Sequence, residues 1–495
     1  MSSGRGLPMV LRTKTYERPE DQDVNTDLLY PVNFNTKGAK FVFDKKGVLD
    51  SNSQINLRQT CNQVGGAEMG CYLPTSTGAL AMIKRAWLTI GGKRVSNLES
   101  VGHYSTWKRL HWSNEYRQGI ANPKQGGDDV YVGSASRAIA DQSTNNFKRS
   151  RGFAPPFGAL GRVSSSFATL SATGVQNADE TDTGTASHQI ITSVSATSPD
   201  FVVGLSQLIP FLIGIQLPLF AIREEVALHL EWADDGFGHR FCIPQANAGQ
   251  QNFIKSTVVR EACYIMADYL FFPNQMDVLM DEMMTKGGYD IPYDEIQIQE
   301  STEPALIGPG ALSNDIQLPL GGKKVKSVVL QQQITDGANI AYSNIGRYNS
   351  VGLRLGSSLN LTVDSKPFYS KALSNNSLKL CEANQVEGVP LQLCDYRYSW
   401  KNQVDAAGAV DKFGLTDRKF NGYPSTNEAG TMNWVGVKIE NSLGEGVRVS
   451  NLPMIWNRKS NNVAADDNGD QRTLRFFIKT HRMLNISRGI ATVIE

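Results

Sequence analysis

The stretch LIPFLIGIQLPLFAIREEVALHLEWADD, from Leu208 to Asp235, changes character halfway along its length. Residues 209–222 are almost continuously apolar, whereas apolar and polar residues alternate strictly from Glu225 onward. Three structures would explain this change: a membrane anchor with a polar tail, a buried helix, or two consecutive strands of a large β-sandwich.

The apolar half is too short and too often interrupted to span a membrane. A transmembrane helix needs about 20 consecutive apolar residues, and this run contains Pro210, Gly214, Gln216 and Pro218. Two prolines this close also argue against an uninterrupted helix. The pattern therefore predicts two strands that turn near Arg223, the first buried on both faces and the second half-buried. No transmembrane segment and no secretory signal is expected elsewhere in the chain.

Length and charge narrow the possible functions. A chain of 495 residues is expected to form more than one domain. Its 49 Lys and Arg residues nearly balance its 48 Asp and Glu residues, and no basic arm is present. Proteins that coat nucleic acid usually carry a basic excess. We therefore expect neither bulk genome packaging nor sequence-specific nucleic-acid binding.

The cysteines do not form a metal or redox motif. No two of them are spaced as Cys-x-x-Cys, so a zinc ribbon and a thioredoxin-type site are not predicted. Six thiols in so long a chain indicate reduced, mostly buried cysteines in an intracellular compartment. They are Cys61, Cys71, Cys242, Cys263, Cys381 and Cys394.

Most of the chain consists of short alternating runs separated by Gly, Asn, Asp, Ser and Pro, which is typical of antiparallel sandwiches or barrels. The clearest runs are residues 81–95 with a Gly91-Gly92 turn, 351–369 ending on the turn DSKP, 432–442 and 473–486. Helices are predicted only at Pro273–Met284 and, more weakly, around Leu98 to Lys108.

The two halves of the chain repeat one outline. Each has a strand, a tight turn and a return strand, then a long polar excursion, then closing strands. The excursions are residues 164–200 and 401–431, and loops of this length tend to be functional surfaces. The order of elements suggests one β-unit used twice, with the helix at Pro273–Met284 between the units.

Two short motifs match catalytic or phosphate-binding patterns only by their letters. The tetrad DTGT at Asp182–Thr185 lies in an acidic, Ser/Thr-rich stretch, whereas aspartic proteases place theirs after a buried strand. The strings GGKR at Gly91 and GGKK at Gly321 lack the preceding Gly and the following Ser or Thr of a phosphate loop. We interpret the first as a solvated loop and the others as turns.

Neither the histidines nor the clustered aromatic residues are predicted to form a binding site. His229 and Glu231 share one strand face, and with His239 or His481 they would resemble the iron-binding triad of jelly-roll oxygenases. The polar face of a strand explains them more simply. The aromatic group Tyr104, Trp107, Trp112 and Tyr116 is interpreted as packing between a helix and a sheet, not as stacking on single-stranded nucleic acid. No catalytic, cofactor-binding or metal-binding residue is predicted.

Four strings, in this order, resemble the double jelly-roll major capsid proteins of eukaryotic double-stranded DNA viruses. This family includes nucleocytoplasmic large DNA viruses, virophages and polinton-like viruses. Residues 82–112 are similar to the I-G-G turn and following helix of the first roll, and residues 215–232 are similar to its L-P-L-x-A strand pair. Residues 263–284 are similar to its closing A-D-Y strand with the linker helix, and residues 473–495 are similar to the terminal strands.

The resemblance implies an all-β fold of two tandem eight-stranded antiparallel jelly rolls with short linking helices. It implies a non-enzymatic virion protein whose homotrimers form pseudo-hexagonal capsomers, tile an icosahedral shell, and contact neighbouring capsomers, penton proteins and minor capsid proteins. The two long excursions would be outer loops or inter-subunit clasps of the trimer. The expected division is an arm at 1–30, a first roll at 31–272, a linker helix at 273–290 and a second roll at 291–495.

Two other functions stay open at this point. A tandem β-sandwich binding protein, lectin-like or carbohydrate-active, would bind glycan and need not trimerise. A jelly-roll metal oxygenase would contain iron. Because fold analogy carries much of the functional inference, assembly and bound metal are the observations that discriminate among the three.

Overall fold

The fold was analysed in a computed structural model of the chain. The structure describes residues 23–63, 77–113, 116, 120–126, 195–197, 200–235, 239–240, 254–272, 276, 280–281, 288–303, 312–334, 348, 357–374, 376–387, 434–440, 446–450, 454–460 and 471–494.

The first unit is a sandwich of two antiparallel sheets. One sheet has the order β1-β14-β5-β10, and the other has the order β3-β12-β7-β8, extended by β2. Their bounds are β1 Asp23–Leu29, β2 Asn33–Asn35, β3 Gly38–Val42, β5 Gln54–Leu57, β7 Ile83–Ile90, β8 Lys93–Leu98, β10 Phe201–Gly204, β12 Val226–Trp232 and β14 Tyr264–Phe271. Short strands add to the first sheet at β4 Val48–Leu49 and β11 Leu217–Pro218. A third, three-stranded sheet contains β6 Gln59–Gln63, β9 Ser195–Thr197 and β13 Ile254–Val258.

The second unit repeats this arrangement. One sheet has the order β15-β23-β17-β20, with β21 beside β17 and β24 beside β23, and the other has the order β16-β22-β18-β19. Their bounds are β15 Tyr289–Glu303, β16 Leu312–Leu318, β17 Lys324–Ile334, β18 Ser357–Val363, β19 Lys366–Pro367, β20 Val435–Lys438, β21 Val447–Arg448, β22 Met454–Ser460, β23 Arg472–Ser487 and β24 Ile490–Ile494.

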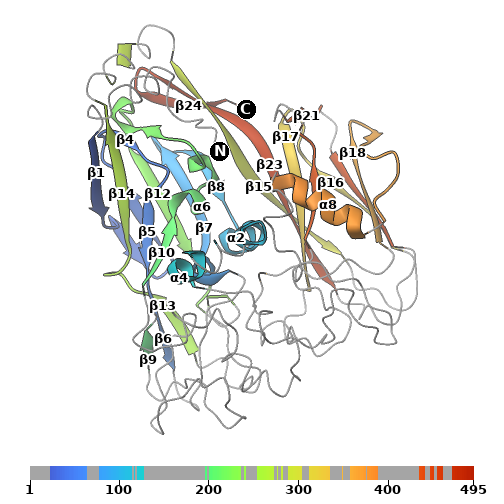
Figure 1. Cartoon of the computed structure of the whole chain (residues 1–495), viewed down its shortest axis with the longest axis horizontal. Helices are drawn as coiled ribbons and strands as arrows, with labels where there is room; N and C mark the ends of the chain where they lie inside the picture. Colours follow the sequence, from blue (N-terminus) through green and yellow to red (C-terminus); the bar gives the residue numbers. More distant parts are fainter. Residues whose placement is uncertain are drawn as a thin grey trace.

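Both units have the strand connectivity of a jelly roll. Taking β1, β3, β5, β7, β8, β10, β12 and β14 as the eight strands of the first unit, one sheet pairs the first, last, third and sixth. The other sheet pairs the second, seventh, fourth and fifth. The second unit gives the same two orders for β15 to β20, β22 and β23. The predicted fold of two tandem antiparallel jelly rolls is confirmed, and Figure 1 shows the two sandwiches side by side.

One helix occupies the same position in each roll. The helix α2, Val101–Leu110, follows the fifth strand β8, and α8, Asn376–Glu387, follows the fifth strand β19. In Figure 1, α2 lies between the two sandwiches and α8 lies on the second. Further short helical segments with described bounds are η2 Gly78–Met82, α4 Asn122–Gln125, α6 Leu205–Leu208, η6 Pro210–Leu212 and η7 Leu219–Ala221. Within the part of the chain that the structure describes, no helix is long and apolar enough to cross a membrane.

The prediction for the opening stretch is half right. Val226–Trp232 forms the expected alternating strand β12, but the apolar half is not a strand. It consists of short helical turns, and only Leu217–Pro218 pairs with another strand. Proline cannot donate to a sheet ladder, and Gly214 adopts a positive φ of 68°, so the chain bends repeatedly here. The run is apolar because most of it is buried, with Ile213 as an exposed exception.

The two predicted hairpins are confirmed. β7 and β8 are joined by Gly91 and Gly92, with φ of 59° and 78°, and β18 and β19 are joined by Asp364 and Ser365, with φ of 49° and 66°. Two consecutive residues in the left-handed region match the right-handed twist of the strands that they connect. Glycine adopts this conformation at little cost, and aspartate tolerates it better than most residues.

Several predicted segments lie wholly or partly outside the described residues. Of the predicted helix Pro273–Met284, the structure describes only Met276, Met280 and Asp281, all helical. The excursion 401–431 and the tetrad DTGT lie outside it, and of the excursion 164–200 only β9 and Asp200 are described.

Candidate functional site between the two jelly rolls

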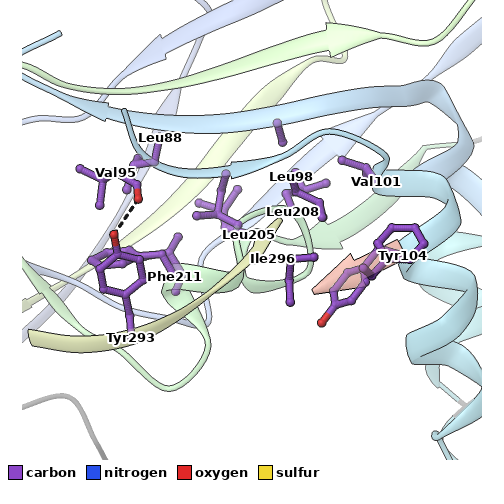
Figure 2. Packing of buried hydrophobic residues seen from close by; sticks show 14 of the residues in the cluster. Leu88, Val95, Leu98, Val101, Tyr104, Leu205, Leu208, Phe211, Tyr293 and Ile296 are labelled. Carbon is purple, nitrogen blue, oxygen red and sulfur yellow. Dashed lines mark hydrogen bonds between the residues drawn. The ribbon is translucent and has the colours of Figure 1, made fainter. Parts of the chain in front are cut away.

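The two rolls meet along an apolar seam between β15 of the second roll and the first roll. The Tyr293 hydroxyl donates a 2.8 Å hydrogen bond to the backbone carbonyl of Val95 in β8. The Phe211 ring, in η6, packs edge-on against Tyr293 with ring centroids 4.8 Å apart. Figure 2 shows this group continuous with the core of the first roll, so the rolls share one hydrophobic core.

A second contact brings α2 against the second roll. Trp107 of α2 is buried, and its ring centroid lies 5.8 Å from that of Trp434, next to β20. Gly436 of β20 leaves the room for this packing: a Cβ there would lie 2.9 Å from Val386 of α8 and 3.6 Å from Trp107. The predicted role of Trp107 as a packing residue is confirmed, and its partners come from the C-cap of its own helix (His111) and from the other roll (Trp434).

Glu387, the last residue of α8, is the polar centre of this contact. The Trp107 Nε1 donates a 2.6 Å hydrogen bond to Glu387 Oε1, and the Lys108 ammonium forms an ion pair with Oε2 of the same carboxylate. Burial alone would raise the pKa of Glu387, but nearby positive charges, first that of Lys108, lower it to about 2. The carboxylate is therefore charged at neutral pH and joins the two helices.

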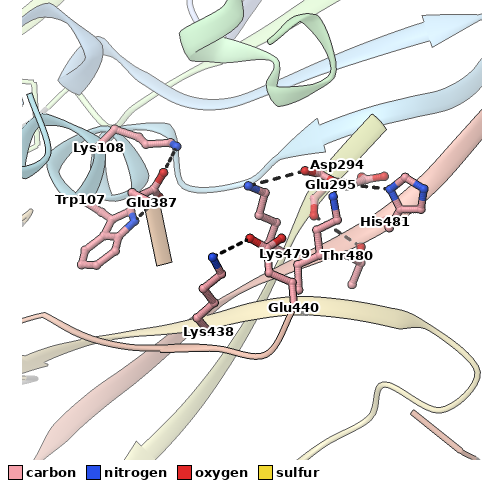
Figure 3. A network of polar contacts seen from close by, with 11 residues as sticks. Trp107, Lys108, Asp294, Glu295, Glu387, Lys438, Glu440, Lys479, Thr480 and His481 are labelled. Atoms are coloured by element: carbon pink, nitrogen blue, oxygen red, sulfur yellow. Dashed lines mark hydrogen bonds and ion pairs between the residues drawn. The ribbon is translucent and has the colours of Figure 1, made fainter. Parts of the chain in front are cut away.

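A second charged cluster surrounds Asp294 of β15. Lys326 Nζ lies 2.6 Å, His481 Nδ1 3.3 Å and Lys479 Nζ 3.5 Å from its carboxylate oxygens. Burial acts to raise the pKa of Asp294, but the hydrogen bond from His481 and the charge of Lys479 together hold it well below its usual value. Figure 3 shows that the clusters of Glu387 and Asp294 lie along one line, with Lys479 between them.

A cavity of about 120 Å³ opens beside these clusters. Its polar lining includes Lys108, Asp294, Lys479 and His481, and its apolar lining includes Pro210, Ile213, Ile215, Pro292 and Ile296. Both rolls contribute to it, because Lys108 and Ile213 belong to the first and Asp294, Lys479 and His481 to the second.

The residues considered for metal binding do not come together. His229 stacks flat on Trp87 with ring centroids 5.1 Å apart, and Glu231 forms an ion pair with Lys84 at 3.1 Å. His481 belongs to the Asp294 cluster, and His239 lies 3.8 Å from Asp234. Among the described residues no group of His, Cys, Asp and Glu has the arrangement of a metal site.

Of the cysteines, two are described as free thiols. Cys263 is buried, as expected for most of the cysteines, and Cys381 is exposed. Burial raises the pKa of Cys263 to about 12, which keeps it an unreactive thiol at neutral pH.

The sequence did not predict the junction, which is the contact between the two rolls formed by the apolar seam and the clusters around Glu387 and Asp294. Its charged residues lie in five separate segments, α2, β15, β17, α8 and β23, and a single Lys or Glu in an alternating strand looks like a solvated face. One signal was present: the run Lys479 to Arg482 puts cationic or titratable side chains at three of four positions of a strand with apolar neighbours.

No protein-family profile matches the chain, and no curated protein matches its sequence. Solved structures do match over nearly the whole length. A chain of the PBCV-1 virus capsid is 11% identical, with a TM-score of 0.52, over 96% of this chain and 97% of that one. The chain has the double jelly-roll fold.

Two further structures agree with this assignment. A chain from the cryo-EM structure of the Sputnik virophage is 10% identical, with a TM-score of 0.52, over 95% of this chain and 88% of that one. The mavirus major capsid protein is 11% identical, with a TM-score of 0.50, over 95% of this chain and 90% of that one. At such low identity the likeness establishes the fold and its length, not the function.

Proposed function

We propose that this chain is the major capsid protein of a double-stranded DNA virus. The observation that carries the proposal is the match over 95–96% of this chain, and therefore over both rolls, to chains from virus capsid and virophage structures. A fold by itself does not imply a function. Here, however, the similarity covers both rolls in sequence and nearly the whole length of each chain, which supports a shared architectural role.

The proposed assembly is a homotrimer of roughly hexagonal outline that tiles an icosahedral shell in the virion. Its partners would be neighbouring capsomers and the penton and minor capsid proteins. The near-zero net charge of +1 supports this role, since many copies pack together without strong mutual repulsion. We propose a structural role without catalytic residues, cofactor or resident metal.

The proposed division of the chain follows the sequence expectation with two changes. All seven residues of Asp23–Leu29 pair with β14, which supports starting the first roll at residue 23 and not at 31. Tyr289 and Asp290 already pair with β23 as the start of β15, which supports starting the second roll at 289 and not at 291. The arm is then residues 1–22, the linker 273–288 and the second roll 289–495.

The test is the absolute mass of the purified chain, measured by light scattering on a sizing column. A stable species at three times the chain mass of 54.3 kDa supports the capsomer, and electron microscopy of that species at high concentration should then show hexagonal arrays. A monomer at every salt concentration contradicts the proposal and favours the glycan-binding alternative, which a glycan screen of the same sample addresses.

A further inference from the structure

The cavity between the rolls has two chemically different walls. One is aliphatic and the other carries ammonium and imidazole groups. Its volume of about 120 Å³ corresponds to roughly four water molecules at ~30 Å³ each, and a cavity of about 150 Å³ holds benzene. The space therefore suits an organic molecule of a few heavy atoms that is apolar at one end and polar at the other.

The charged wall carries more positive than negative charge. The Asp294 carboxylate lies within 3.5 Å of Lys326, Lys479 and His481 and is closest to Lys326. Lys479 also interacts with the charge of Glu387. Glu387 is already engaged by Lys108 and by the Trp107 indole. Lys108, Lys326 and Lys479 thus face Asp294 and Glu387, which leaves one positive charge of this group uncompensated.

This surplus lies in a partly enclosed place. The side chains of Lys479 and His481 are each 30% exposed, so they are accessible from the cavity but shielded from bulk water. A charge in such a site attracts a counter-ion more strongly than one on an open surface. The aliphatic wall opposite, with Ile213 53% exposed, disfavours a fully hydrated inorganic ion.

We infer that the cavity binds a monocarboxylate that carries a small aliphatic group. The carboxylate accepts hydrogen bonds from the Lys479 ammonium and the His481 ring, and the aliphatic group packs against Ile213, Ile215 and Ile296. Two sources have this chemistry: a free short-chain acid and the C-terminal carboxylate of a peptide that ends in a small aliphatic residue. The inference is independent of capsid assembly, because every group that forms the site belongs to one chain.

Isothermal titration of the full chain at pH 7 and constant ionic strength tests the site. The probes are butyrate, its neutral isostere butyramide, sulfate, and N-acetylvaline with its amide. Saturable binding of one butyrate or one N-acetylvaline per chain, with no binding of the amides, supports the inference, and the tighter of the two acids identifies the source. Binding of butyramide or sulfate as tightly as butyrate would overturn it, and so would no binding of either acid.

Two variants assign the binding to this cavity. Lys479→Met keeps the aliphatic stem and removes the charge, so the affinity for the acid should fall by about tenfold or more. The matched control is Lys438→Met, since Lys438 has similar exposure (31%) and its own partner Glu440 at 3.2 Å, and does not line the cavity.

A second variant, Ile213→Asp, tests the site independently in case Lys479→Met does not fold. Ile213→Asp lies on an exposed turn and adds a negative charge at the edge of the cavity, so it should abolish binding while the unfolding temperature stays unchanged. Ile213→Ser serves as its uncharged control and should weaken binding only a few fold. Unchanged affinity in both Lys479→Met and Ile213→Asp would overturn the inference.

Discussion

Trp107 and Glu387 lie 280 positions apart in the chain, yet the indole Nε1 donates a 2.6 Å hydrogen bond to the carboxylate. The two residues sit on helices that follow the fifth strand of their respective rolls. The internal repeat of the fold therefore supplies both halves of the contact that holds the repeats together. Stability of the whole chain should depend on this pair more than on ion pairs within either roll.

Removal of the Glu387 carboxylate should destabilise the protein. Glu387→Ala leaves the Trp107 N–H and the Lys108 ammonium without their shared partner. Loss of one member of a buried pair costs roughly 3–5 kcal/mol, and because the Lys108 side chain is 28% exposed we expect about 2–3 kcal/mol of unfolding free energy. Urea denaturation followed by tryptophan fluorescence measures it. Glu440→Ala, which breaks the Lys438 pair, is the control and should cost below about 1 kcal/mol; equal losses in both variants would contradict the central role of Glu387.

The same carboxylate should make stability depend on acidity. The pKa of Glu387 is about 2 in the folded chain and 4.5 in the reference state, so the unfolded chain binds the proton more tightly. Its contribution, about 3 kcal/mol, is present above pH 4.5 and is lost as the pH falls towards 2. Glu387→Gln should remove this part of the dependence of the unfolding free energy on pH. Unfolding free energies measured at several pH values between 2 and 6 should converge at low pH, and parallel curves for variant and wild type would disprove the assignment.

Gly436→Ala should disturb the junction through volume alone. The new Cβ would lie 2.9 Å from Val386 Cγ2 and 3.3 Å from the Ala383 Cα, so α8 must shift away from β20. Overpacking of this kind costs typically 1–3 kcal/mol. Gly204→Ala is the control, because its nearest neighbour is a side-chain oxygen 3.6 Å away. Calorimetry should show a lower unfolding temperature for the first variant only.

Tyr293→Phe tests the apolar seam. The substitution keeps the ring against Phe211 and removes the hydroxyl that donates to the Val95 carbonyl. A buried acceptor left without its donor costs about 1–2 kcal/mol. Tyr269→Phe removes a hydroxyl that accepts a 3.3 Å hydrogen bond from the Asp44 amide within the first roll. Limited proteolysis should cut the Tyr293 variant between the rolls faster than the Tyr269 variant, and equal rates would show that the hydrogen bond does not hold the rolls together.

The local elements were readable from the sequence because their causes are local. The alternation at Val226–Trp232 and the turns at Gly91-Gly92 and Asp364-Ser365 follow from side-chain period and backbone freedom, which neighbouring residues decide. The strand predicted for the apolar half of the opening stretch was wrong because a buried segment has the same apolar composition whether its backbone is extended or turned. Its prolines argued against an uninterrupted helix, but only the tertiary structure decided that most of it forms short helical turns and not a strand.

The sequence by itself determined that this chain is antiparallel β, that it contains one unit twice, and that its charges nearly cancel. The junction was decided only by the tertiary structure. Lys108, Asp294, Glu387 and Lys479 come from four segments, and nothing in their spacing predicts that they meet. Their proximity follows from the docking of two rolls across one core, which is a long-range packing solution. Their charge is maintained there because each buried carboxylate lies beside an ammonium group, which offsets the cost of removing both from water.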